Sequence, residues 1–252
     1  FVSTSNRIQK PLSKAGDHTR IDWGTFYLAA SDKNSEPFMN DGRAARTGFL
    51  SGKKIGEKSG EEIGLVIDLG NVKAHGGYIM AGYDDNYSIQ YFGQNLRPYW
   101  NRNNDSDIFK QFALAARDYK KLMKESARFD AELLKEAAEV GGDEYATLCA
   151  LAYRQAVAAH KLVESPKGEI LWLSKENDSN GSIGTVDVTY PSAPMFLIYN
   201  PELVKGLMNH IFDYSESGRW TKPFPAHDVG TYPLANGQTY SGDMPVEEGG
   251  NM

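Results

Sequence analysis

The chain has 252 residues, of which 40% are hydrophobic and 24% are charged, and its formal net charge is −6. This composition is typical of a globular protein with a sizeable core and excludes extensive disorder. An acidic chain with a pI near 5.4 lacks the basic surface by which proteins bind nucleic acid or anionic membranes. No apolar run approaches the roughly 20 residues of a membrane span. The sequence therefore predicts neither a nucleic-acid nor a membrane partner, and it leaves the oligomeric state open.

The first part of the chain, up to about Trp100, is rich in short β-forming runs. Strands are predicted within residues 19–28, 63–69, 77–83 and 87–92, and the turn cluster at 84–86 predicts a hairpin between the last two. Residues 32–60 are rich in Gly, Ser, Lys and Glu, and they are predicted to form one long polar loop. Several short strands separated by turn clusters are typical of a β-sandwich.

The apolar residues change to a helical period after Asn104. Asp105 is the predicted N-cap of a helix over residues 108–123. A second helix over 129–137 is predicted to stop at Gly141-Gly142, and a third is predicted from Asp143 to about Val163. Consecutive helices with short connections favour antiparallel hairpins.

From Pro166 onward the sequence becomes irregular. A short strand is predicted at 169–174, and a helix is predicted at 201–214, where Pro201 occupies the first position. Around them lie three loops dense in Gly, Asn, Asp, Tyr and Pro, at residues 175–191, 220–233 and 236–248. Long structured loops beside helices are frequent sites of function.

Each of these loops contains residues suited to acid–base chemistry, and each also has a structural interpretation. The first loop offers Asp187 among its hydrogen-bonding groups, which also include Glu176, but a turn-rich connection needs such residues too. In the second loop His227 stands beside Asp228, a pair that titrates near neutral pH or simply caps a turn. In the third loop Asp243 is a predicted N-cap that would place Glu247 and Glu248 early in a helix, where the helix dipole favours acids.

Other chemistries find less support. Gly181 and Gly184 do not form a phosphate-binding motif. The five histidines, His18, His75, His160, His210 and His227, show no clustered spacing, so neither a zinc site nor any other metal or cofactor is predicted. Cys149, the only cysteine, lies in an apolar helical stretch that indicates a buried structural residue, and no Ser or Thr stands in a nucleophile motif.

Several long strings in the sequence resemble the glutaminase A family of fungi and Bacteroidetes-type bacteria. They are residues 226–238 followed by 244–248 and 250–252, the stretch 184–191, and the shorter strings 83–85, 91–93, 153–155 and 158–161. One departure is Gly249, where the family usually has Cys or Ser. The resemblance implies a β-sandwich followed by a six-hairpin (α/α) toroid, with residues 1–104 as the end of the first domain and 105–252 as the beginning of the second.

The resemblance also implies a secreted or periplasmic enzyme that hydrolyses L-glutamine to glutamate and ammonia. The chain begins with Phe1 instead of Met and ends within a predicted first helical turn. We therefore expect an internal fragment of a longer enzyme, with little or no turnover on its own.

The predicted mechanism is attack by a water molecule that carboxylates activate in the toroid cleft. The predicted catalytic residues are Asp187, Asp228, Glu247 and Glu248, and the predicted substrate-binding residues are Asn177, Tyr190, His227, Tyr232 and Trp172. One alternative is a glycoside hydrolase, in which a carboxylate pair flanks a sugar and an aromatic ring stacks on it. The other is a carbohydrate-binding protein without catalysis. The predicted partner is a small molecule, either glutamine or a sugar.

Overall fold

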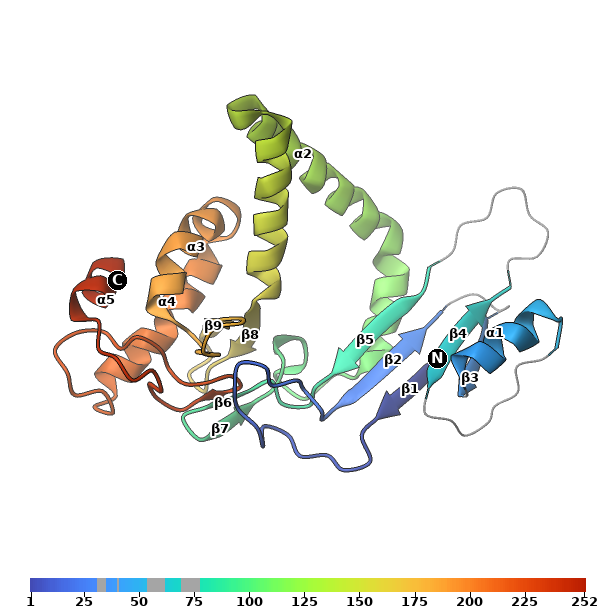
Figure 1. The fold of residues 1–252 in the computed structure, drawn as a ribbon, viewed down its shortest axis with the longest axis horizontal. Helices are drawn as coiled ribbons and strands as arrows, with labels where there is room; N and C mark the ends of the chain where they lie inside the picture. The colour runs from blue at the N-terminus through green and yellow to red at the C-terminus, as the bar shows by residue number, and fades with distance from the viewer. Residues whose placement is uncertain (31–34, 40, 54–61, 69–77) are drawn as a thin grey trace. The chain divides into compact units, whose positions relative to one another are not determined.

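The computed structural model describes residues 1–30, 35–39, 41–53, 62–68 and 78–252 (Figure 1). The chain divides into two compact units. Unit 1 comprises Phe1–Gln9, Asp22–Asp85 and Ser106–Tyr119, and unit 2 comprises Lys10–Ile21, Asn86–Asp105 and Lys120–Met252. Among the helices of the described residues, none combines the length and the apolar character that crossing a membrane requires.

Unit 1 contains an antiparallel three-stranded sheet and a separate strand pair. The sheet has the order β1 (Val2–Ser5), β2 (Thr25–Ala29), β5 (Met80–Asp84), and the pair consists of β3 (Ser35–Met39) and β4 (Ile63–Ile67). Helix α1 (Gly42–Leu50) begins after Asp41, whose carboxylate accepts a hydrogen bond of 2.7 Å from the backbone N–H of Arg43. The prediction of one polar loop over 32–60 is therefore wrong for its described residues, because Asp41 caps a helix and β4 pairs with 35–39. Residues 32–34, 40 and 54–60 lie outside the described part.

The predicted hairpin between residues 77–83 and 87–92 is wrong. Strand β5 pairs with β2, whereas β6 (Ile89–Tyr91) pairs with β7 (Gln94–Leu96). Phe92 and Gly93, with φ values of 45° and 83°, form the two-residue turn between β6 and β7. Positive φ at both central positions is the requirement of the tight hairpin turn that matches strand twist, and glycine adopts it without strain.

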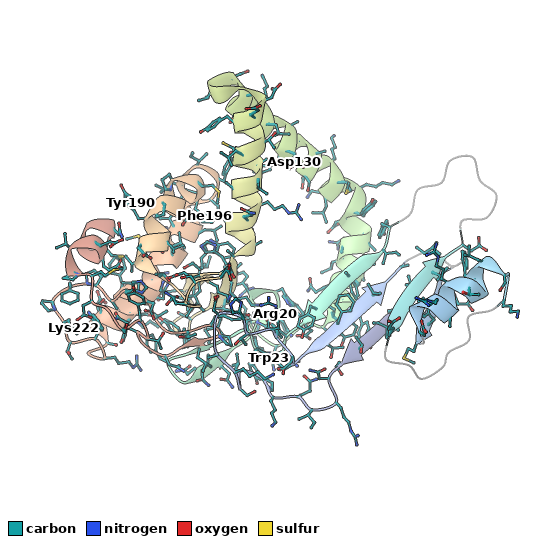
Figure 2. All side chains as sticks on the ribbon, in the orientation of Figure 1. Arg20, Trp23, Asp130, Tyr190, Phe196 and Lys222 are labelled. Atoms are coloured by element: carbon teal, nitrogen blue, oxygen red, sulfur yellow. The ribbon has the colours of Figure 1, made fainter. Side chains whose placement is uncertain are left out.

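The core of unit 1 lies where the first turns of helix α2 (Ile108–Ala158) pack on its sheet. A Cβ atom on Gly82 of β5 would lie 2.8 Å from Phe112 Cζ and 3.1 Å from Ile108 Cδ1, so the helix approaches the strand at a residue without a side chain. Tyr27 of β2 meets Phe109 edge-on, with ring centroids 5.7 Å apart. Trp23, labelled in Figure 2, is fully buried.

Helix α2 replaces the first two predicted helices and part of the third. Residues 124–128 contain good helix formers and neither Gly nor Pro, so nothing interrupts the helix there. The expected stop occurs at Gly142, whose φ of 83° and ψ of 179° are not helical. The first turn is capped by Asp107 and not by Asp105, since Asp107 Oδ1 accepts a hydrogen bond of 2.8 Å from the N–H of Lys110. The predicted end near Val163 is wrong, because the helix ends at Ala158 and the next residues enter a strand.

Unit 2 is built on two small sheets and the helices that cover them. Strands β8 (His160–Glu164) and β9 (Ile170–Ser174) form an antiparallel pair. The second sheet has the order β10 (Leu234–Ala235), β6, β7. The 3-10 helix η1 (Tyr99–Asn101) follows β7 in the chain. Helix α4 (Pro201–Glu216) lies on β9 at Gly206, where an added Cβ would be 2.9 Å from Trp172 Cβ. The main core contains Ile89, Tyr91, Val163, Leu171, Leu173, Ile183, Val186, Ile211, Tyr214, Ala226, Val229 and Ala235.

Helix α3 (Val186–Tyr199) is the largest element that the sequence does not predict. It lies beside α4 (Figure 1) and contains Pro191 and Pro194. Proline lacks a backbone N–H and disfavours the helical conformation of the residue before it. For this reason the sequence pattern does not indicate a helix at these residues. The final helix, α5 (Pro245–Asn251), has Met244 at its N-cap, and the expected cap Asp243 instead pairs with Lys222.

Candidate functional site

Two segments far apart in the sequence hold the candidate site by backbone hydrogen bonds. The N–H of Ile183 donates to Gly230 O at 2.9 Å, and the N–H of Val229 donates to Ile183 O at 3.0 Å. The N–H of Val186, the first residue of α3, donates to His227 O at 2.9 Å. This pairing places the His227-Asp228 dipeptide against the first turn of α3, which contains Asp187.

Asp228 is fully buried and its carboxylate is held by five hydrogen bonds, the longest of which, 3.4 Å, comes from Thr239 Oγ1 to Oδ1. Oδ1 accepts the N–H groups of Gly230 at 2.8 Å and Thr239 at 3.0 Å, and Oδ2 accepts the N–H of Tyr240 at 3.1 Å. Oδ2 also lies 2.9 Å from His227 Nδ1. Because a carboxylate accepts and Nδ1–H donates, this contact leaves His227 Nε2 free to act on another group.

The imidazole of His227 is fixed on its face and at its edge. Its ring stacks on Tyr240, with centroids 4.1 Å apart and planes 15° from parallel. His227 Nε2 lies 3.9 Å from Asp187 Oδ2. Burial lowers the pKa of His227, but the hydrogen bond to Asp228 and the negative charges of Asp228, Asp187 and Glu248 outweigh burial, so the pKa is raised above its ordinary value.

Glu248 lies in the first turn of α5, and its side chain is 0% exposed. Neither of its carboxylate oxygens makes a hydrogen bond of ordinary geometry among the described residues, although the side chain of Asn251 is close enough to donate toward the carboxylate. Burial, followed by the nearby charge of Asp187, raises the pKa of Glu248 to about 7. Its neighbour Glu247 is exposed. One of two adjacent acids therefore lies in the candidate site, and the other faces solvent.

Glu176 joins this group although the sequence indicated it only as one of several hydrogen-bonding residues in its loop. Its Oε2 accepts a hydrogen bond of 2.8 Å from Ser179 Oγ, and its buried Oε1 has no partner among the described residues. One ligand-type atom each from Glu176, Asp187 and His227 lie within 4.8 Å of one another. No spacing rule reveals this cluster, because its members lie on a loop, a helix and a second loop.

The remaining predicted site residues make their contacts with other groups. Asn177 is exposed and exchanges hydrogen bonds of 3.0 and 3.1 Å with Lys175, and Tyr190 is 61% exposed on α3 (Figure 2). Tyr232 is half-buried, and Lys175 Nζ lies 5.6 Å from its ring centroid. Trp172 is buried with Phe196 and Leu207 in a second apolar cluster. The structure thus brings together Asp187, His227, Asp228 and Glu248.

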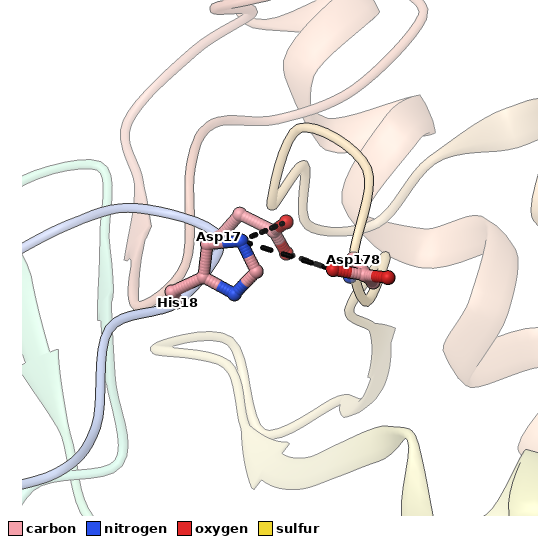
Figure 3. Close-up of side chains that lie close together, drawn as sticks. All are labelled: Asp17, His18 and Asp178. Carbon is pink, nitrogen blue, oxygen red and sulfur yellow. Dashed lines mark hydrogen bonds and ion pairs between the residues drawn. The ribbon is translucent and has the colours of Figure 1, made fainter.

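A second cluster of acids and histidine lies at the surface. It consists of Asp17, His18 and Asp178 (Figure 3), and the side chains of His18 and Asp178 are 74% and 92% exposed. Asp17 Oδ1 already accepts a hydrogen bond of 3.0 Å from the N–H of Asp178 and lies 3.6 Å from Lys175 Nζ. In contrast to Glu176 Oε1 and Asp187 Oδ1, which are buried without a partner among the described residues, Asp17 Oδ1 has partners within the chain.

Carboxylates grouped around one positioned imidazole are typical of the broad class of proteins that bind or transform small polar molecules. Comparison with known families narrows this class. Residues 142–252 match the glutaminase A six helical-hairpin domain, and residues 1–136 match a domain of unknown function, DUF5127. The chain therefore belongs to the glutaminase A family, and the predicted mixture of strands with a six-hairpin domain is confirmed. The sandwich architecture and the boundary at residue 104 stay predictions.

Two curated fungal proteins are similar to the chain. "Glutaminase A" of Aspergillus oryzae is 29% identical, in an alignment that covers 92% of this chain and 36% of that protein. "Probable glutaminase" of Arthroderma benhamiae is 34% identical over 128 residues, or 50% of this chain and 15% of that protein. The chain thus spans little more than a third of the length of the first relative. No solved structure matches it.

Proposed function

We propose that the group formed by Asp187, His227, Asp228 and Glu248 hydrolyses the side-chain amide of L-glutamine to give glutamate and ammonia. The observation that carries this proposal is Glu248, a carboxylate that is 0% exposed and makes no hydrogen bond of ordinary geometry among the described residues, although Asn251 lies close enough to act on it. A buried group without a partner is costly unless a ligand or the reaction uses it. The names of the two fungal relatives support the choice of glutamine.

The proposed reaction is general base catalysis at an amide. The carboxylate of Glu248 takes a proton from water, and the water oxygen attacks the amide carbon. When the C–N bond breaks, the same proton passes to the leaving nitrogen, which departs as ammonia. Asp228, itself held by backbone and side-chain donors, positions His227 through Nδ1, and the imidazole and Asp187 line the place where the amide binds.

A glycoside hydrolase is the second candidate. Two carboxylates, Asp187 and Glu248, lie close enough for the charge of one to raise the pKa of the other, and Tyr240 offers an aromatic ring next to His227. Paired carboxylates beside an aromatic ring are also the arrangement of many sugar-cleaving sites. The two functions differ in the bond cleaved, so a substrate comparison separates them.

Ammonia release from L-glutamine and cleavage of aryl glycosides should be measured in the natural polypeptide that carries this sequence. We expect ammonia release, and we expect Glu248→Gln to reduce kcat by about 10²- to 10⁴-fold, the contribution typical of a general base. Glu247→Gln is the matched comparison because it changes the adjacent, exposed acid. A larger loss in Glu247→Gln than in Glu248→Gln would contradict the assignment of the base. Cleavage of a glycoside without ammonia release would show that the site performs sugar chemistry.

A further inference from the structure

Glu176, Asp187 and His227 have the arrangement of a metal-binding site. Each offers one ligand atom, and the three atoms lie within 4.8 Å of one another. His227 Nε2 and Asp187 Oδ2 are 3.9 Å apart, which is too long for a hydrogen bond. Ligand bonds to a zinc-type ion are about 2.0–2.2 Å long, so an ion placed between these two atoms would bind both.

The partner of His227 on the opposite side of the ring strengthens this interpretation. A histidine that binds a metal usually donates its other N–H to a carboxylate, which fixes the ring orientation. His227 Nδ1 meets Asp228 Oδ2 at 2.9 Å, and three backbone N–H groups hold that carboxylate. The ring is thereby oriented with Nε2 toward Asp187 before any ligand arrives.

The carboxylates in and beside the cluster also lack hydrogen bonds that they need. Asp187 Oδ1 and Glu176 Oε1 are buried without a partner among the described residues. Glu248, whose charge interacts with both Asp187 and His227, is 0% exposed, and neither of its oxygens makes a hydrogen bond of ordinary geometry among the described residues. Glu176 and Asp187 are half-buried. Three carboxylates grouped at one imidazole would therefore be stabilised by a cation in addition to any charge on His227, because unpaired anions shielded from water are destabilising.

We propose that Glu176, Asp187 and His227 bind one divalent transition-metal ion of the zinc or manganese type. One imidazole nitrogen with carboxylate oxygens is a donor set that suits these ions. A bound ion would polarise a water molecule, and Glu248 would remain beside it as a base. The proposal stands on the donor set and not on the proposed substrate.

In the experiment, the natural polypeptide is first treated with a chelator. It is then titrated with Zn²⁺ or Mn²⁺ in a calorimeter, which measures the heat of binding. We expect one ion per chain, with an affinity that falls by more than about 100-fold in Glu176→Gln and in Asp187→Asn. Asp228→Asn, which removes the acceptor of His227 Nδ1–H without removing a proposed ligand, should weaken binding by about 10- to 100-fold. The matched control is Asp178→Asn in the exposed cluster, which should bind as tightly as the natural protein. Circular dichroism of the metal-free variants verifies that each one is folded.

The expected pattern supports the proposal, and every other pattern overturns it. The absence of stoichiometric binding in the folded natural protein overturns it directly. Binding that Asp178→Asn removes while Glu176→Gln retains it would assign the ion to the surface cluster. A third outcome is that neither ion binds, but that glutamine, through its ammonium group, stabilises the natural protein and not Glu176→Gln. In that case the oxygens of Glu176 and Asp187 bind an ammonium group and not a metal ion. Because these measurements record binding and not ammonia release, they can fail while the proposed hydrolysis holds.

Discussion

His210 is a fully buried titratable group in α4, and acidification should destabilise unit 2 through it. Its Nε2 lies 3.1 Å from Gly184 O, and its Nδ1 lies 3.3 Å from Gly206 O. Burial lowers the pKa of His210 from 6.5 to about 4. The two carbonyl contacts and the charge of Asp213 oppose this shift, and His160 reinforces it, but burial is the largest of these effects.

The sign and the size of the effect follow from the two pKa values. Between pH 6.5 and about 4 the unfolded chain binds a proton at His210 and the folded chain does not, so the free energy of unfolding falls as the pH falls. The stabilisation that uncharged His210 contributes is fully present above pH 6.5, the unfolded pKa, and it is lost as the pH falls toward about 4, the folded pKa. At about 1.4 kcal/mol for each pKa unit, the total loss is on the order of 3 kcal/mol.

The assay is urea unfolding followed by tryptophan fluorescence at several pH values between 7 and 4. The natural protein is compared with His210→Gln, which keeps an amide donor but does not titrate. Groups that do not interact with His210 contribute equally to both proteins, so the difference between the two pH profiles reports His210 together with its coupling to His160 and Asp213. Parallel profiles would refute the reasoning, and so would a natural protein that gains stability relative to the variant on acidification. The latter result would mean that two hydrogen bonds from the charged ring outweigh burial.

Two further predictions concern packing in unit 2. Gly206→Ala should destabilise the protein by about 1–3 kcal/mol because the new methyl group would lie 2.9 Å from Trp172 Cβ, although alanine favours helix by about 1 kcal/mol. Gly249→Ala should not destabilise the protein, because nothing lies within 4 Å of the new Cβ. If the urea midpoint rose in both Gly206→Ala and Gly249→Ala, the close packing of Gly206 on Trp172 would be contradicted. Leu173→Ala, at a fully buried position, should cost about 2–5 kcal/mol. Leu122→Ala, at a position that is 48% exposed, should change the free energy of unfolding by less than about 0.5 kcal/mol. Equal losses of stability in the two variants, measured by thermal denaturation, would contradict the burial of Leu173.

Features with local causes could be predicted from the sequence. Gly142 interrupts α2 as expected, because its backbone conformation is one that glycine adopts without strain. Pro201 begins α4 as expected, since its missing N–H has no role in a first helical turn. Leu148 and Leu151 lie on the apolar face of the second part of α2, yet they are 60% and 48% exposed. A helical period identifies an apolar face, but it does not specify what covers that face.

The candidate site was predictable only in part, because its residues meet through tertiary structure. His227-Asp228 is a recognisable pair within one loop, and acids at 247 and 248 are a recognisable feature of a helix start. The selection of Glu248 over Glu247 depends on which side of α5 is buried. Asp187 was expected in a loop, and its helix was concealed by two prolines. Glu176 joins the group only because the tertiary structure brings its loop close to Asp187 and His227.

The second sheet of unit 2 has a consequence for how this unit folds. Strand β10 pairs in parallel with β6, and the N–H of Gly93 donates to Asn236 Oδ1 across 143 residues of sequence. Closing a flexible loop of that length costs roughly 4 kcal/mol of chain entropy, and pairings between distant residues slow folding. Helix α2 and the β8–β9 hairpin consist of local contacts and can form early. We therefore expect the pairing of β6 with β10 to appear in the last kinetic phase, after residues 89–93 and 234–236 have met.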